Sequence, residues 1–399
     1  MTALRLILAA CCLLSAVWGQ QPLFPPDRLE RIQRGLRDVY GLEYAQGTKN
    51  FQTMIAETPE DPAGYVYLAY TYLVQELRSQ QELSIDRFAA SDSFSETPRY
   101  VPRVDPAAEE RFRKLSGQAI EKARARLAKA PGDRAALFLL GLSYQNLASF
   151  EAALKRNWWG AFRFGVRTNR YHRDLLLGDP NFHDARLATG VFQYVAGSLG
   201  WKTKWVAFLA GYRGSRARGK QELEAASQKA QLVADDARVI LVLVHTRERN
   251  YQKAFDYLNE LLRKHPQNYL AHLDMGGMAL LMKRPEAAIE IYQDVLRKQQ
   301  AAEGKYAELE KAMVETRLGV AFRQKGDLGA AMEWFGKALA EEGLSARART
   351  ITRLEIAKTL DLLARRDEAG EHYRAVASAE DVAGSRQEAQ ELLRRPYRR

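Results

Sequence analysis

Residues 276–292 read GGMALLMKRPEAAIEIY, and the spacing within this stretch decides the fold. Gly276 is followed by Ala288 twelve residues later and by Tyr292 four residues after that. Two small residues at this spacing let two antiparallel helices approach closely, and the aromatic side chain fills the seam between them. The stretch therefore predicts a helical hairpin.

The same spacing occurs four times in the second half of the chain. The four sets are Val242, Ala254 and Leu258; Gly276, Ala288 and Tyr292; Gly319, Ala331 and Phe335; and Ala357, Ala369 and Tyr373. A single hairpin cannot bury its apolar face alone, so copies at a period near 34 residues must stack on one another. The pattern predicts a helical solenoid.

A second marker extends the repeat toward the N-terminus. In each of several units a proline precedes a small residue by ten positions, and proline is favoured where one helix ends and the next begins. These pairs are Pro59 and Ala69, Pro131 and Gly141, Pro180 and Gly190, and Pro266 and Gly276. The repeats are therefore expected to run through most of the chain.

These units resemble the tetratricopeptide repeat family. Leu140, Gly141 and Tyr144 match the Leu-Gly-Tyr of that family's first helix, and Pro266 matches its closing proline. The family's tryptophan position never holds tryptophan here, so the repeats are divergent. The resemblance implies an all-α fold, a right-handed superhelical solenoid of about seven helical hairpins.

The N-terminus has the layout of a secretory signal peptide. Arg5 precedes an uncharged run over residues 6–18, which is too short to cross a bilayer, and a small residue, Gly19, follows it. We expect cleavage after Gly19 and an exported bacterial protein, periplasmic or associated with the outer membrane. Lipoprotein processing at Cys11 is the alternative.

Both cysteines, Cys11 and Cys12, lie within this leader, so the mature chain is expected to have no disulfide and no cysteine-ligated metal.

Composition divides the chain into five segments. They are a signal peptide over 1–19, a flexible tether over 20–27, degenerate repeats over 28–233 with insertions at 80–106 and 197–218, clearer repeats over 234–380, and a C-terminal capping helix with a basic tail over 381–399.

The net charge of +11 is concentrated between residues 155 and 220, where thirteen Lys and Arg face three Asp. Four of the six tryptophans lie in the same segment. One interpretation is that the rings fill enlarged hairpins while the charges are solvated; the other is a surface for anionic lipid or polymer. The candidate residues for that surface are Arg163, Arg167, Arg170, Lys202, Lys204, Arg213, Arg216 and Arg218.

The resemblance also implies a concave groove formed by the first helices of the hairpins, in which an extended segment of a partner protein lies. The candidate groove residues are Val239, Leu243, Leu273, Leu280, Thr316, Val320, Arg323, Leu354 and Lys358. This groove is mostly apolar. It either holds a hydrophobic segment of a partner or is closed by tight superhelical packing.

The sequence contains no recognisable motif for catalysis or for metal binding. The six histidines show no metal-ligand spacing beside a carboxylate, and no phosphate loop, nucleophile elbow or acid pair occurs. We expect no catalytic residue, metal, cofactor or small-molecule substrate, and the leader argues against a nucleic acid partner. The sequence predicts a non-enzymatic protein-binding scaffold of the cell envelope, with a peripheral membrane or anionic-polymer binding protein as the alternative.

Overall fold

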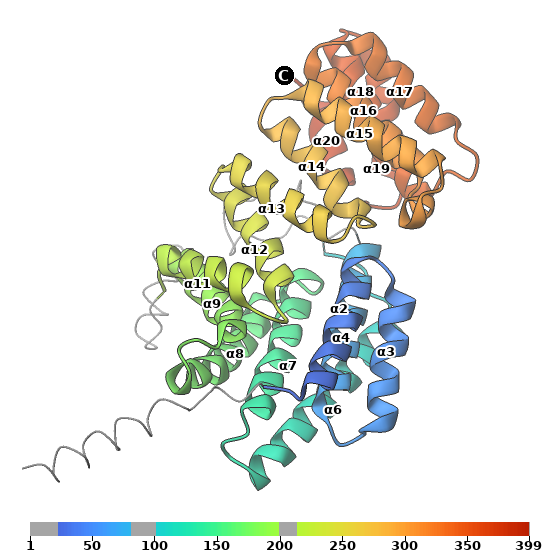
Figure 1. Ribbon diagram of the computed structural model, residues 1–399. Helices are drawn as coiled ribbons and strands as arrows, with labels where there is room; N and C mark the ends of the chain where they lie inside the picture. The colour runs from blue at the N-terminus through green and yellow to red at the C-terminus, as the bar shows by residue number, and fades with distance from the viewer. Residues whose placement is uncertain (1–22, 81–100, 199–213, 399) are drawn as a thin grey trace, which may run out of the picture.

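The computed structural model is a solenoid of stacked α-helical hairpins (Figure 1). The structure describes residues 23–80, 101–198 and 214–398. Within these ranges there are seventeen α-helices, and each helix packs against the next along the chain. The all-α solenoid predicted from the spacing of small and aromatic residues is confirmed.

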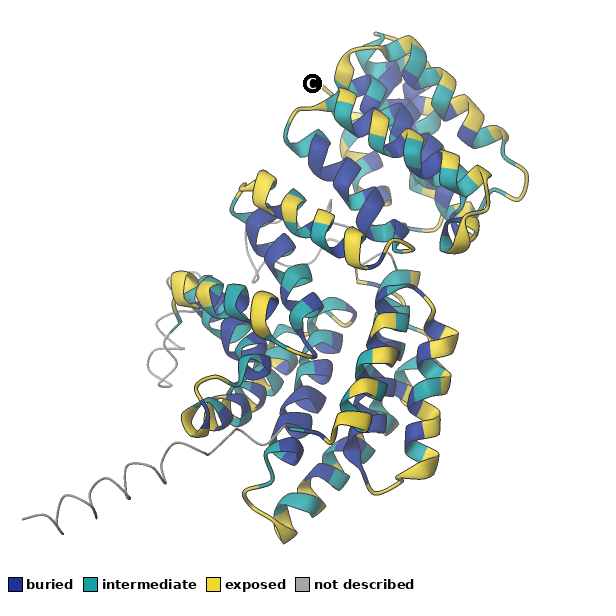
Figure 2. Cartoon of the chain, in the orientation of Figure 1, coloured by how far each residue is buried: buried dark blue, intermediate teal, exposed yellow. Residues whose placement is uncertain are grey.

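The first half of the chain forms four hairpins. Their helix pairs are α2 (Pro26–Tyr40) with α3 (Tyr44–Glu57), α4 (Pro62–Ser79) with α6 (Pro106–Lys129), α7 (Arg134–Ala153) with α8 (Trp158–Gly178), and α9 (Arg186–Ser198) with α11 (Arg216–Lys229). A short 3₁₀ turn, η1 (His183–Ala185), precedes α9. The helix α7 is buried along most of its length (Figure 2).

The second half forms four more hairpins and a final helix. The pairs are α12 (Ala234–Arg247) with α13 (Tyr251–Lys264), α14 (Tyr269–Leu281) with α15 (Pro285–Gln300), α16 (Lys311–Lys325) with α17 (Leu328–Ala340), and α18 (Ala346–Leu362) with α19 (Arg366–Ser378). A 3₁₀ segment, η2 (Gly304–Glu308), precedes α16, and α20 (Ser385–Arg394) packs on α19.

The motif positions explain why the helices of each hairpin pack so closely. Ala254, Ala288, Ala331 and Ala369 are all fully buried. A methyl group added at Gly276 would overlap the ring of Tyr292, and one at Gly319 would overlap that of Phe335. The glycine of the first helix thus leaves a space, and the aromatic ring of the second helix occupies it.

Side-chain caps explain where several helices begin. Asp61 accepts a hydrogen bond from the backbone N of Ala63 at 2.8 Å, and Asp133 accepts one from Ala136 at 2.9 Å. Asn268 caps α14 in the same way at 3.1 Å. Such caps satisfy backbone donors that have no partner within the helix.

The structure has one hairpin more than the seven expected. The additional hairpin is α2 with α3, and it follows the same spacing as the others: Gly35, Gly47 twelve residues later, and Phe51 four after that. A methyl group at Gly35 would overlap the Phe51 ring, as at Gly276. The spacing was present in the sequence and was overlooked there.

Two expected boundaries, those of the tether and of the second insertion, differ from the structure, while the helices on either side of the first insertion lie within one residue of the expected bounds. The flexible tether over 20–27 is shorter than expected where it is described, because Phe24 is buried and α2 already begins at Pro26. The first insertion has α4 ending at Ser79 and α6 beginning at Pro106, with 81–100 outside the described residues. The second insertion is narrower than 197–218, since helices reach Ser198 and resume at Arg216; 199–213 are outside the described residues. The leader, with Cys11, also lies outside them.

Candidate functional site

The nine candidate groove residues lie on the first helices of the last four hairpins. Two are on α12, two on α14, three on α16 and two on α18. None of them is fully exposed, and Leu273, Thr316, Arg323 and Leu354 are buried. Four of the nine residues are therefore shielded from solvent by other parts of the chain, and the other five are partly shielded.

The N-terminal hairpin and α4 cover one end of the groove. The hydroxyl of Tyr70 on α4 donates to Asp236 Oδ1 at 2.6 Å, and the hydroxyl of Tyr40 on α2 donates to the same oxygen. Asn268 Nδ2 at the start of α14 donates to the backbone oxygen of Tyr40 at 2.9 Å. These contacts hold α2 and α4 against α12 and α14, beneath the last hairpins in Figure 1.

The end of α4 adds a second set of contacts in the same region. Arg78 donates to the hydroxyl of Tyr269 and to Glu308 Oε2, the latter at 3.3 Å. Its guanidinium carbon also lies 5.4 Å from the ring centroids of Tyr44 and of Tyr269. In addition, Lys305 Nζ on η2 lies 2.9 Å from a carboxylate oxygen of Glu43. Half-buried ion pairs and stacked cations therefore link the two halves of the solenoid.

Charged groups line the other end of the groove. Arg323 on α16 pairs with Glu355 on α18, and Lys358 Nζ lies 2.8 Å from Glu355 and 2.7 Å from Glu388 of α20. Burial opposes ionisation of Glu355, but Lys358 and Arg323 outweigh it and lower its pKa to about 2. The cluster therefore stays ionised throughout the physiological range.

The segment after α20 lies over this cluster. The ring centroid of Tyr397 is 5.5 Å from the guanidinium carbon of Arg323 and 5.9 Å from Lys358 Nζ. Its backbone N donates to Asp361 Oδ2 at 2.8 Å. A partner could reach Arg323 and Lys358 only after this segment moved away.

Replacing Tyr397 with alanine should loosen this cover. Each cation and ring contact at such a half-exposed site contributes about 0.5 to 1 kcal/mol. We expect backbone amides in the second half of α18 to exchange hydrogen about fivefold faster. Hydrogen exchange followed by mass spectrometry measures this. Arg398→Ala is the matched control, because Arg398 is exposed and makes no contact of this kind; equal exchange in the two variants would contradict the prediction.

The structure separates the residues proposed for an anionic surface. Arg163, Arg167 and Arg170 lie on α8, and Arg216 and Arg218 lie on α11. Arg167 stacks on the rings of Tyr144 and Phe164, and Arg216 donates to Ser198 Oγ at 3.1 Å. Lys202, Lys204 and Arg213 lie outside the described residues.

Of the described residues in this set, Arg170 and Arg218 line a common cleft and the other three do not. The cleft has a volume of about 520 Å³ and lies between α8, α9 and α11. Arg173 and Arg186, which the sequence analysis did not select, also line it, so we call it the arginine cleft. The other residues that line the cleft are Val166, Asn169, Leu176, Leu177, Pro180, Thr189, Phe192, Gln193 and Glu222.

The aromatic residues of this region mostly pack inside the hairpins. Tyr144 stacks with Phe164 and Tyr171, at centroid distances of 6.1 and 6.0 Å, and Phe182 packs edge-on against Phe138. Among the described large apolar side chains in this region, Trp159 and Leu177 of α8 are the exposed ones. Packing therefore accounts for most of these rings, while the cations of the cleft lie on the outside.

The family comparison agrees with this geometry. Residues 245–312, from the end of α12 to the start of α16, match the family model described as tetratricopeptide repeat. The chain contains divergent tetratricopeptide repeats. No curated protein matches its sequence.

Several solved structures are similar to this tetratricopeptide repeat protein. Yeast Tom70 has a TM-score of 0.37 at 10% identity and covers 90% of this chain and 86% of its own. The human IFIT1 dimer with m7Gppp-AAAA has a TM-score of 0.44 at 13% identity, covering 93% and 88%. A tetratricopeptide repeat protein from Parabacteroides merdae has a TM-score of 0.31 at 13% identity, covering 82% and 98%. We transfer no ligand, partner or activity from any of them.

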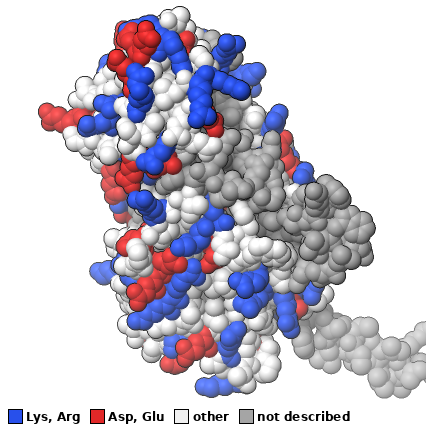
Figure 3. Space-filling view, turned by 180° about the vertical axis from the view of Figure 1, so that it is seen from behind, with Lys and Arg blue, Asp and Glu red and all other residues white. Residues whose placement is uncertain are grey.

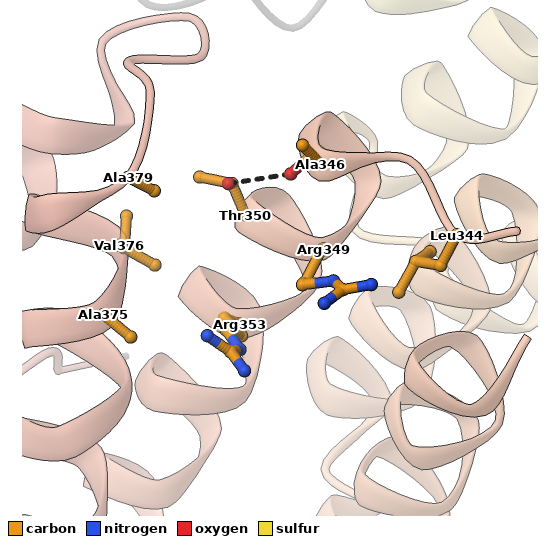
Figure 4. A pocket seen from close by; sticks show the side chains of 8 residues that line it. All are labelled: Leu344, Ala346, Arg349, Thr350, Arg353, Ala375, Val376 and Ala379. Atoms are coloured by element: carbon orange, nitrogen blue, oxygen red, sulfur yellow. Dashed lines mark hydrogen bonds between the residues drawn. The ribbon is translucent and has the colours of Figure 1, made fainter.

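A smaller cleft lies between α18 and α19 of this repeat protein (Figure 4). It has a volume of about 360 Å³, and its charged residues are Arg349 and Arg353. The only hydroxyl, that of Thr350, donates to the backbone oxygen of Ala346 at 2.9 Å. Two arginines beside an occupied hydroxyl provide no acid and base pair for catalysis.

The described histidines that are buried have structural partners or apolar surroundings. His172 Nε2 lies 3.2 Å from the backbone oxygen of Phe138, and burial lowers its pKa to about 4. His272 Nδ1 lies 2.9 Å from the hydroxyl of Tyr306, and burial likewise lowers its pKa to about 4. No group of three His, Cys, Asp or Glu is placed to hold a metal ion within the described ranges.

Among the same residues, no helix is long and apolar enough to span a bilayer.

Proposed function

We propose that this chain is a non-enzymatic protein-binding scaffold that is exported to a bacterial cell envelope. The observation that carries the proposal is the stack of eight hairpins, which presents long continuous surfaces formed by many helices. Tetratricopeptide repeat proteins in general use such surfaces to bind other proteins. Export rests on the leader pattern over residues 1–19 alone.

The charge distribution supports a protein partner. On the face drawn in Figure 3, acidic and basic side chains are interspersed over the described surface. A scaffold that recognised only extended polyanions would be expected to have a broad basic face. The excess of positive charge in the sequence instead lies within residues 155–220, and four of those arginines line the arginine cleft. The comparisons give no support to the membrane or anionic-polymer alternative.

Partner capture tests the scaffold. The mature chain, immobilised through a tag, is incubated with envelope extract, and an unrelated helical protein of similar size and charge serves as the control. We expect one or a few proteins to be retained in a fixed ratio to the bait. A second step then uses the purified candidate alone, so that direct binding is measured. If no purified candidate binds the mature chain directly, the proposal that the chain is a protein-binding scaffold is overturned.

Export is tested separately. Cell fractionation with mass spectrometry of the N-terminus should find the chain outside the cytoplasm, beginning at Gln20. If the mature N-terminus is instead a lipid-modified Cys11, the chain is processed as a lipoprotein and is not cleaved after Gly19. A full-length chain retained in the cytoplasm would reject export while leaving the scaffold proposal intact.

A further inference from the structure

Four arginines line the arginine cleft, and two of them have no ion pair with another described residue. We propose that it binds an acidic segment of a partner protein that also carries an apolar side chain. The proposal names the chemistry of a partner and therefore rests on the protein-binding function above. Four features of the cleft support it: its charge, the close packing of the helices that form its floor, its apolar lining residues and its position between three helices.

Two of the four arginines have no ion pair with a described residue, although Asp174 follows Arg173 on the same helix. Arg170 and Arg173 lie one turn apart on α8, both are exposed, and neither has a hydrogen bond or ion pair with another described residue. On the opposite side, Glu222 is shared by Arg186 at 2.5 Å and Arg218 at 3.9 Å. Glu222 is the one carboxylate among the residues that line the cleft, against four guanidinium groups, so positive charge predominates there. Guanidinium groups bind carboxylates with paired, directional hydrogen bonds.

The floor of the cleft is fixed before any ligand binds. Gly190 of α9 and Gly219 of α11 bring these two helices into backbone contact, and an added methyl group at either glycine would overlap the other helix. Arg186 links the same helices, since it bonds Glu222 of α11 and also the backbone oxygen of Pro180 at 2.6 Å. A rigid floor reduces the ordering that a ligand must impose.

Part of the cleft lining is apolar. The apolar lining residues are Val166, Leu176, Leu177, Pro180 and Phe192. Leu177 is 77% exposed, the largest exposure among the described large apolar side chains. A ligand that covered Leu177 would remove this surface from water, which favours binding independently of charge. A purely ionic ligand would leave it exposed.

The position of the cleft between three helices favours a peptide over a lipid surface. Asn169 also lines the cleft, and its side-chain amide has no partner among the described residues. An extended peptide can enter a hollow between three helices and pair its backbone groups with such an amide. A flat bilayer surface cannot follow that hollow. Anionic lipid is therefore the competing ligand in the test.

The test measures binding of a fluorescein-labelled twelve-residue peptide of glutamate and aspartate with two leucines to the full mature chain. The variant is Arg170→Gln with Arg173→Gln. The control is Arg263→Gln with Arg374→Gln, which removes the same charge from exposed arginines on α13 and α19. We expect the cleft variant to bind at least tenfold more weakly and the control to stay within twofold of wild type. Circular dichroism should show all three proteins equally folded.

Two further measurements examine the apolar lining residues and the competing ligand. A peptide with both leucines changed to serine should bind about fivefold more weakly to wild type, and Leu177→Ser should reduce that difference. Raising the salt from about 0.05 to about 0.3 M should weaken binding, because the ion pairs are near the surface. The proposal is overturned if the control variant loses as much affinity as the cleft variant. It is also overturned if only vesicles containing phosphatidylglycerol, and not the peptide, bind wild type and lose binding in the cleft variant.

The two proposals fail in distinguishable ways. If the partner captured from envelope extract binds wild type and the cleft variant equally, the scaffold stands and the cleft proposal is overturned. If no partner binds directly but the acidic peptide binds through Arg170 and Arg173, the cleft stands as an anion site and the scaffold is overturned.

Discussion

Replacing Asp236 with asparagine is expected to remove a rise in stability that the wild-type protein shows on mild acidification. Burial raises the pKa of Asp236 to about 6, and the neighbouring charge of Asp235 adds to this, although the hydroxyls of Tyr40 and Tyr70 donate to it. The carboxyl is thus protonated in the folded protein at a pH where the unfolded chain is still ionised.

The sign of the effect follows from linkage. A group whose pKa is raised on folding contributes stability that is fully present below the unfolded pKa and is lost as the pH rises through the folded value. For Asp236 this window runs from the ordinary value of 3.8 to about 6. Between pH 7.5 and 4.5 wild type should therefore gain about 2 kcal/mol relative to Asp236→Asn.

Urea unfolding at both pH values, with wild type and variant in parallel, measures this difference. Other groups cancel in the comparison, including His172 and His272, whose pKa values are lowered to about 4 and which favour the opposite trend. The pKa of Asp235 is lowered to about 2: burial opposes this, but His265 and Lys264 outweigh it. Its contribution is therefore lost only at lower pH. Parallel pH profiles for wild type and Asp236→Asn would show that the Asp236 carboxyl titrates normally.

The repeat itself could be predicted because its cause is local. The contact between Gly276 and Tyr292 joins two positions sixteen residues apart, and the same spacing joins Gly319 to Phe335. Such a rule is visible in the sequence as soon as one copy is recognised. The α2 and α3 hairpin follows it through Gly35 and Phe51, so it was within reach of the same rule.

The covering of the groove could not be predicted in this way. Tyr40 meets Asp236 across 196 residues, and the contact depends on how far the solenoid curls over several hairpins. Small differences in packing angle add up along a stack, and no short pattern records their sum. The contact of Tyr397 with Arg323 has the same origin, since α20 and the following segment must turn back over α18.

The arginine cleft is an intermediate case. Arg170 and Arg218, predicted from the basic segment of the sequence, lie in one cleft. Arg163 and Arg167 were predicted with them but do not line that cleft, whereas Arg173 and Arg186, which were not predicted, do. Clustering along the sequence indicates that charge is local. Which charges converge depends on the faces that α8, α9 and α11 turn toward one another.

Replacing Gly276 with alanine should destabilise the protein even though alanine is the better helix former. Gly276 lies within α14, and a methyl group there would overlap the ring of Tyr292, which is fully buried between two hairpins. Neither the ring nor the helix can shift without disturbing the next unit. Overpacking of this kind costs about 1 to 3 kcal/mol, so the free energy of unfolding should fall by about that amount.

Gly336 provides the matched control, because it lies within α17 and an added methyl group would have no neighbour within 4 Å. At this exposed position alanine should raise the free energy of unfolding by about 0.5 to 1 kcal/mol through helix propensity alone. Both substitutions add the same methyl group to a helix, so opposite signs in urea unfolding isolate the seam between Gly276 and Tyr292. Stabilisation by both would mean that the two helices do not meet at this seam, and the repeat register built outward from residues 276–292 would then be wrong.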